Sequence, residues 1–146
     1  MKKWLLFLLL ATLTACDAPA EPLDLQQEYS ALTEAAELPQ MLTLDKSAME
    51  SFCGIEQELV VQGVVCICAD SLRTDEIWLL EAKDKASLEQ IKALADARLA
   101  QKAAESAGYS PEQYAVVRQA VMLERGRYFA LLVSPNAAAL RDALGW

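Results

Sequence analysis

The feature that most constrains the fold is a pattern that occurs twice, in which two short apolar segments precede a helical one. Residues 58–69 are rich in valine and isoleucine, and residues 76–82 repeat this character after the polar connection 70–75. Such runs predict antiparallel β-strands. Residues 120–123 and 128–133 form the second pair, and Gly126 between them permits the positive φ of a tight hairpin.

Five further segments carry helix signals. The expected N-terminal capping residues are Asp24, Ser47 with Glu50, Asp84, Ser110 with Pro111 and Gln113, and Ser134 with Pro135. Apolar residues recur at helical spacing at Leu25, Tyr29, Leu32 and Ala36, at Leu88, Ile91, Ala95 and Leu99, and at Leu140 and Leu144. The expected ends are Pro39, Gly54, Gly108 and Val117.

The element order is therefore α-α-β-β-α-α-β-β-α. We expect an α+β fold, a two-layer sandwich whose four-stranded, mainly antiparallel sheet carries helices on one face. Residues 24–146 are long enough for one hydrophobic core, and we expect a single domain there.

The first 15 residues have the composition of an export signal. Lys2 and Lys3 give a positive start, and an apolar run from Trp4 to Leu13 leads to small residues that end at Ala15. A membrane-spanning helix needs about 20 apolar residues, and Asp17 and the residues after it end the run well before that length. Residues 1–15 are therefore predicted to be a signal peptide.

The residues Leu13-Thr14-Ala15-Cys16 resemble the lipobox of bacterial lipoproteins, in which the cysteine sulfur receives a diacylglyceryl group. The resemblance implies lipidation of Cys16 and cleavage between Ala15 and Cys16. Residues 16–23, with proline-spaced polar residues, are expected to form an extended tether. The alternative is an ordinary signal peptide followed by a chance cysteine. In an envelope with two membranes, Asp17 would resemble an inner-membrane retention signal.

Charge and composition exclude several classes of function. The chain has 13 Lys and Arg against 21 Asp and Glu, and two lysines leave with the signal, so the mature net charge is −10. Such a surface repels nucleic acids. With no histidine, catalysis by Ser-His-Asp or Cys-His is excluded, and no glycine-rich phosphate loop is present. The sequence predicts no cofactor and no metal site.

Three cysteines remain after Cys16, and three interpretations apply to them. Cys66 and Cys68 fit small apolar residues packed on a strand. Cys53 could form a disulfide with one of them, whereas Cys66 and Cys68 are a poor pair for each other. Redox chemistry needs a reactive thiolate, and three thiolates without histidine make an incomplete zinc site.

Carboxylates and aromatic residues offer further candidates. Asp75 and Glu76 at a strand entrance could act as a hydrolytic pair, and a solvated turn explains them equally well. Glu112 fits the first turn of a helix. Four aromatic residues fit core packing, with a ligand surface as the alternative: Trp78, Tyr114, Tyr128 and Phe129.

Four motifs in this order resemble a family of uncharacterised lipoproteins from Gram-positive bacteria that carry one domain of unknown function. After the lipobox they are Leu38-Pro39-Gln40-Met41, Thr74-Asp75-Glu76-Ile77, Pro111-Glu112-Gln113-Tyr114, and Arg125-Gly126-Arg127-Tyr128 with Leu131-Leu132-Val133. Cys66 and Cys68 are not part of this pattern. The resemblance implies architecture and location, and it implies no catalytic residue.

These observations favour a non-enzymatic binding or interaction domain, held at the outer face of the cytoplasmic membrane by the lipid on Cys16. An envelope protein or a small ligand is the expected partner. The alternative is an anchored hydrolase that uses Asp and Glu, and a third hypothesis is thiol redox chemistry at Cys66 or Cys68.

Overall fold

A computed structural model describes residues 21–146. The expected signal peptide 1–15, Cys16 and the first part of the tether lie outside the described residues. The helices are α1 (Leu25–Ala35), α2 (Lys46–Cys53), the 3-10 helix η1 (Gln57–Leu59), α3 (Lys85–Ala107), α4 (Pro111–Arg118) and α5 (Ala137–Leu144). The strands are β1 (Met41–Thr43), β2 (Val60–Cys68), β3 (Glu76–Ala82), β4 (Val121–Arg125) and β5 (Tyr128–Val133). None of these helices combines the length and the apolar character needed to cross a bilayer.

The strands form one antiparallel sheet in the order β1-β2-β3-β5-β4. This confirms the α+β class, the predicted strand pairs and the hairpin, where Gly126 has φ +61°. The prediction of four strands is wrong, because β1 adds a fifth between α1 and α2 and changes the element order. Strand β1 pairs Leu42 with Ile67, and its three residues are too few to show a period.

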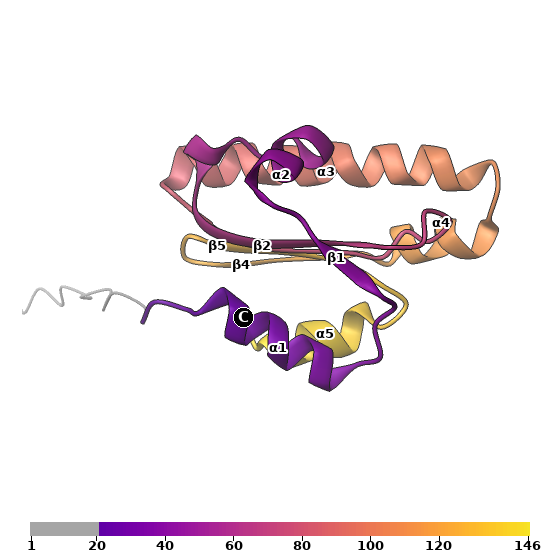
Figure 1. Cartoon of the computed structure of the whole chain (residues 1–146), viewed down its shortest axis with the longest axis horizontal. Coiled ribbons are helices and arrows are strands. Elements are labelled where there is room, and N and C mark those ends of the chain that lie inside the picture. Colours follow the sequence, from indigo (N-terminus) through magenta and orange to yellow (C-terminus); the bar gives the residue numbers. More distant parts are fainter. Residues whose placement is uncertain (1–20) are drawn as a thin grey trace, which may run out of the picture.

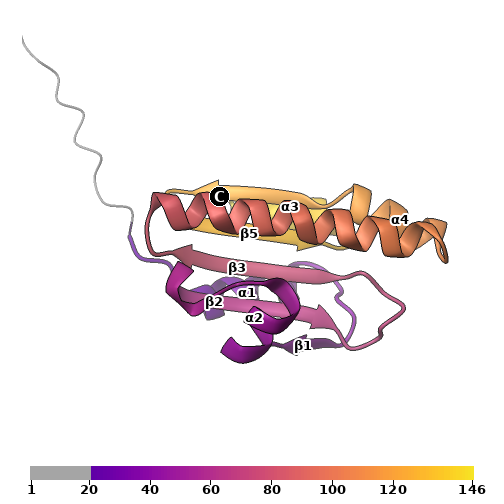
Figure 2. The ribbon, with the colours of Figure 1, turned by 90° about the horizontal axis from the view of Figure 1, so that it is seen from above.

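Helices cover both faces of the sheet, with α2 and α3 on one face and α1 and α5 on the other (Figure 1). The expected two-layer arrangement with helices on one face is therefore wrong. Viewed from above, α3 runs along the strands while α2 lies over β2 (Figure 2). The molecule has three layers.

The two central strands explain why both faces need a cover. Every residue of β3 and β5 is buried. On β3, Trp78 and Leu80 belong to the core beneath α3, whereas Ile77 and Leu79 pack in the core shared with α1 and α5. A strand buried on both faces has a continuous apolar run instead of an alternating one, as residues 77–80 do.

The helix starts follow local hydrogen bonding. Asp24, Asp84 and Ser110 cap α1, α3 and α4 as predicted, each accepting from backbone N–H groups of the first turn. The N-cap of α2 is Asp45 and not Ser47, because the Asp45 carboxylate accepts from the Ala48 N–H at 2.8 Å. The N-cap of α5 is Asn136 and not Ser134. Gly54 ends α2 in the left-handed conformation, whereas Gly108 ends α3 at a negative φ.

Candidate functional site

The main polar cluster of the described domain is centred on Glu76, the first residue of β3. Its side chain has no exposed surface and lies on the sheet face that α3 covers. Arg98 and Lys102, one turn apart on α3, point at it. We call Glu76, Arg98 and Lys102 the Glu76 cluster.

Each oxygen of the Glu76 carboxylate is engaged. Arg98 donates from Nε at 3.1 Å and 3.2 Å to the two oxygens and from Nη2 at 2.9 Å to Oε2. Lys102 Nζ lies 2.7 Å from Oε2. The indole N–H of Trp78, on the same strand face, donates to Oε1 at 2.7 Å. Charge-assisted bonds of this length bind the carboxylate firmly.

The electrostatics of the cluster favour an ionised carboxylate. Burial alone would raise the pKa of Glu76, but hydrogen bonds and positive charge from Arg98 and Lys102 outweigh it, so this pKa lies below its usual value. Burial lowers the pKa of Arg98, and the contact with Glu76 more than compensates, so that pKa is raised. Glu76 therefore holds no proton to give to a substrate at neutral pH.

Asp75 lies next to Glu76 in the chain but serves a separate pair. Asp75 lies just before β3, and its carboxylate accepts hydrogen bonds from Arg73 Nε at 3.0 Å and Nη2 at 3.3 Å. The exposed fractions of Asp75 and Glu76 are 1% and 0%, so their interpretation as a solvated turn is wrong. Asp75 lines the polar pocket beside the Glu76 cluster and Glu76 does not, so the two carboxylates do not meet in one cleft as a hydrolytic pair requires.

Thr74 connects the cluster to α4. Its backbone N–H and hydroxyl both donate to Gln113 Oε1, at 2.8 Å and 3.0 Å, and its carbonyl accepts from Lys102 Nζ at 3.1 Å. Gln113 therefore does not complete the expected capping box with its side chain. Instead, the motifs around Thr74 and Gln113 that carry the family resemblance meet at one end of the sheet.

A polar pocket of about 170 Å³ lies beside this cluster. Its charged and aromatic lining consists of Asp70, Arg73, Asp75, Arg98, Lys102, Glu105 and Tyr109. Arg98 and Lys102 line this pocket and also bind Glu76. The polar side chains of the wall could form hydrogen bonds with a small polar ligand. No group of three or more Cys, Asp and Glu side chains within residues 21–146 is arranged to hold a metal ion.

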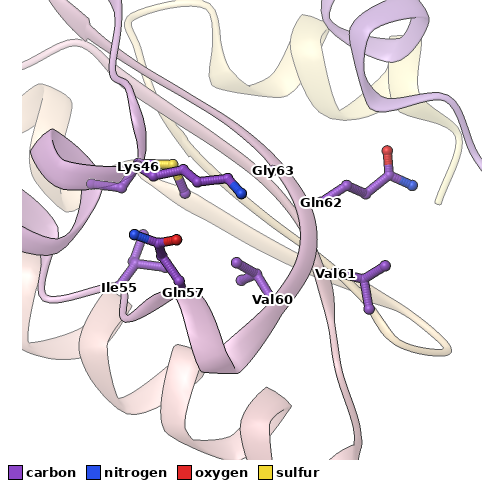
Figure 3. Close-up of a pocket in the computed structure, with 8 residues that line it drawn as sticks. Lys46, Ile55, Gln57, Val60, Val61, Gln62 and Gly63 are labelled. Carbon is purple, nitrogen blue, oxygen red and sulfur yellow. The ribbon is translucent and has the colours of Figure 1, made fainter.

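A second cavity, of about 70 Å³, lies at the outer edge of β2 (Figure 3). It is lined by Lys46, Met49, Ile55, Gln57 and the first half of β2. Figure 3 shows the Lys46 side chain extended along the cavity toward Gly63. No sequence pattern indicated this site, because it joins the start of α2 to an unpaired strand edge.

The three described cysteines are buried free thiols. Cys53 packs in the core beneath α3 and Cys66 in the core on the opposite face of the sheet, so these two cysteines form no disulfide. Cys66 and Cys68 are buried on β2, which confirms that they pack as strand residues. Cys53 Sγ lies 3.9 Å from Glu76 Oε1. Burial, reinforced by the Glu76 charge, raises the Cys53 pKa to about 12, the opposite of a reactive thiolate.

The remaining candidates divide between core and surface. Trp78, Tyr128 and Phe129 are buried, which confirms core packing, whereas Tyr114 is 38% exposed and does not belong to the core. Glu112 lies in the first turn of α4 as predicted. Arg98 and Lys102 were missed, although they extend the buried stripe that contains Ile91 and Ala95 at the same helical spacing.

Fold and site together define a three-layer α+β domain in which the buried carboxylate of the Glu76 cluster is paired within the chain. The chain belongs to the family described as a domain of unknown function, DUF4358, whose model matches residues 34–134. This confirms the expected resemblance to a single domain of unknown function. No curated protein and no solved structure matches the chain.

Proposed function

We propose that the chain is a non-enzymatic binding domain, anchored by lipid at the outer face of the cytoplasmic membrane. The observation that carries the proposal is that the buried carboxylates of Glu76 and Asp75 are both paired with basic side chains of the same chain. Arg98 and Lys102 both form ion pairs with Glu76, and Arg73 forms one with Asp75. A general acid or base must instead exchange a proton with its substrate and be tuned to a pKa near neutrality.

The anchor is supported by the N-terminal sequence. The apolar run ends in Leu13-Thr14-Ala15-Cys16, and the tether that follows leads to the first described helix. A mature chain with a net charge of −10 has no electrostatic attraction for anionic lipid. Stable attachment therefore needs covalent lipid, and the two acyl chains of a diacylglyceryl cysteine are sufficient.

A carboxylate-dependent hydrolase finds less support. Asp75 lies just before β3 and lines the polar pocket, whereas Glu76 is not among the residues that line it, and each is bonded to a basic side chain of this chain. Thiol redox chemistry is also disfavoured, because Cys66 has no exposed surface and Cys68 is 9% exposed.

The non-enzymatic part is tested with the full-length protein and a panel of glycan, peptide and ester substrates. We expect no turnover above that of the Glu76→Gln variant. Turnover by the wild-type chain that Glu76→Gln or Asp75→Asn abolishes, with the fold retained by circular dichroism, would instead establish the hydrolase.

The anchor is tested by metabolic labelling with radioactive palmitate, followed by membrane fractionation. We expect the label and the membrane location in the wild-type chain and in Cys68→Ala, and the loss of both in Cys16→Ala. Labelling that survives in Cys16→Ala would show that Cys16 is not the attachment site.

A further inference from the structure

The outer edge of β2 is only partly covered. Strand β1 pairs with Cys66 to Cys68 alone, which leaves the first half of the nine-residue β2 without a neighbour on that side. Val61 and Gly63 in this half are exposed. A strand edge of this kind presents backbone donors and acceptors to an incoming strand.

Hydrogen bonds farther along β2 fix the direction of its backbone groups. The Cys68 N–H donates toward β3, to the Asp75 carbonyl at 3.0 Å, whereas the Val65 carbonyl accepts from the Leu44 N–H on the outer side at 2.8 Å. Directions alternate along an antiparallel strand, so Gly63 presents its N–H and C=O outward, as Val65 does. Gly63 has no side chain to obstruct a partner.

The opposite edge of the sheet is protected in a way that β2 is not. Strand β4 ends in Glu124 and Arg125, and Glu124 forms an ion pair with Lys92 at 2.8 Å. Charged residues on edge strands discourage pairing with another chain. Residues 60–64 of β2 carry no charge and no proline.

The cavity in Figure 3 lies at this edge and could accept a side chain of a peptide bound there. Its apolar lining, from Met49, Ile55 and Val60, has room for a small aliphatic side chain. Lys46 is exposed and extends toward Gly63, and within residues 21–146 no carboxylate lies within ion-pair distance of its Nζ. Its charge is thus available to a ligand, and a carboxylate complements it.

We infer that this edge binds an extended peptide segment of another envelope protein, by addition of a strand next to Gly63. A carboxylate of the peptide meets Lys46, and a neighbouring aliphatic side chain enters the cavity. Strand addition is an established mode of peptide recognition, in which main-chain bonds give affinity and pockets give specificity. The inference rests on the proposed binding function and names the chemistry of the partner.

The described end of the expected tether lies close to β2. The Gln62 side-chain amide, next to Gly63, donates to the Leu23 carbonyl at 3.1 Å. Leu23 is the last residue of the expected tether, and its own N–H donates to the Tyr128 hydroxyl of β5 at 3.0 Å, so it lies on the sheet face that α1 covers.

The test uses full-length protein in detergent micelles and a phage library of random short peptides. Two variants block the edge: Lys46→Glu reverses the charge, and Val61→Lys adds a charge to the open strand. Each has a matched control. The control for Lys46→Glu is Lys85→Glu, because Lys46 and Lys85 are the first residues of α2 and α3. The control for Val61→Lys is Met122→Lys, which adds the same charge at an exposed apolar residue of β4.

We expect enriched peptides that combine Asp or Glu with β-branched residues. Their affinity should fall about tenfold or more in Lys46→Glu and Val61→Lys, and stay unchanged in both controls. The Gly63 amide should also exchange hydrogen about tenfold more slowly when the peptide saturates the protein.

Three results would overturn the inference. The first is a library that yields no peptide dependent on Lys46 and Val61. The second is binding that leaves Gly63 exchange unaltered. The third is a dimer in sedimentation that Val61→Lys dissociates and Met122→Lys does not, which would assign the edge to a second copy. None of these results would demonstrate turnover or alter lipidation, so the proposed function fails only in its own tests.

Discussion

Arg98 and Glu76 connect the middle of α3 to the start of β3, with three nitrogen–oxygen distances between 2.9 Å and 3.2 Å. The carboxylate is fully buried, and 15% of the Arg98 side chain is exposed. A buried pair of this kind costs desolvation when it forms, and it is costly to break because one charge is then left without a partner.

Replacement of Arg98 should therefore destabilise the domain strongly. We expect Arg98→Ala to lower the free energy of unfolding by about 3 kcal/mol, because Glu76 stays buried with only Lys102 as counter-ion. Urea denaturation followed by circular dichroism measures the change. Lys92→Ala, which breaks the exposed ion pairs with Glu89 and Glu124, is the control and should change stability little. Equal effects of the two variants would show that burial of the pair is unimportant.

Stability should also depend on pH through Glu76. Its pKa is lower in the folded than in the unfolded chain, so its contribution is complete above about pH 5 and is lost as pH falls through the lowered native value. Urea midpoints measured across this range should fall less steeply in Glu76→Gln. Asp84, whose pKa the Ser87 N–H lowers, leaves a residual slope of the same sign. Identical slopes in wild type and variant would contradict the assignment.

Local sequence signals predicted much of the secondary structure. The strand pairs, the hairpin at Gly126 and the caps at Asp24, Asp84 and Ser110 all depend on residues close together in the chain. Strand β1 was missed because it owes its conformation to Ile67 and its neighbours on β2, not to its own three residues. The third layer was missed although the continuous apolar runs of β3 and β5 indicated two buried faces.

The Glu76 cluster could not be predicted from the spacing of its residues in the sequence. Arg98 and Glu76 are 22 residues apart, and only the packing of α3 on the sheet brings them together. Glu76 resembles a turn residue in sequence because acidic residues are common at strand entrances. The one usable signal was on α3, where Arg98 and Lys102 occupy the stripe that faces the core.

Cys53 should be inert toward alkylation in the folded protein. Burial, aided by the Glu76 charge, raises its pKa to about 12, so about one thiol in ten thousand is ionised at pH 8. Iodoacetamide labelling at pH 8 with mass spectrometry should leave Cys53 unmodified for hours, and guanidinium chloride should make it react fully. Rapid modification of native Cys53 would show that the thiol is accessible, and would reopen the redox hypothesis.

Gln113 gives the last prediction, because its side chain connects α4 to Thr74. Gln113→Ala leaves the Thr74 N–H without its acceptor and leaves the hydroxyl only the Gln113 carbonyl at 3.5 Å, and Thr74 is 4% exposed. An unsatisfied buried donor costs about 1 to 3 kcal/mol, so the urea midpoint should fall accordingly. Gln113→Glu puts a carboxylate oxygen where the amide oxygen was, keeps an acceptor for Thr74, and should avoid most of the loss. Gln119→Ala, at the exposed end of α4, is the control. If Gln113→Ala and Gln119→Ala lose the same stability, the contact with Thr74 does not hold α4 to the sheet.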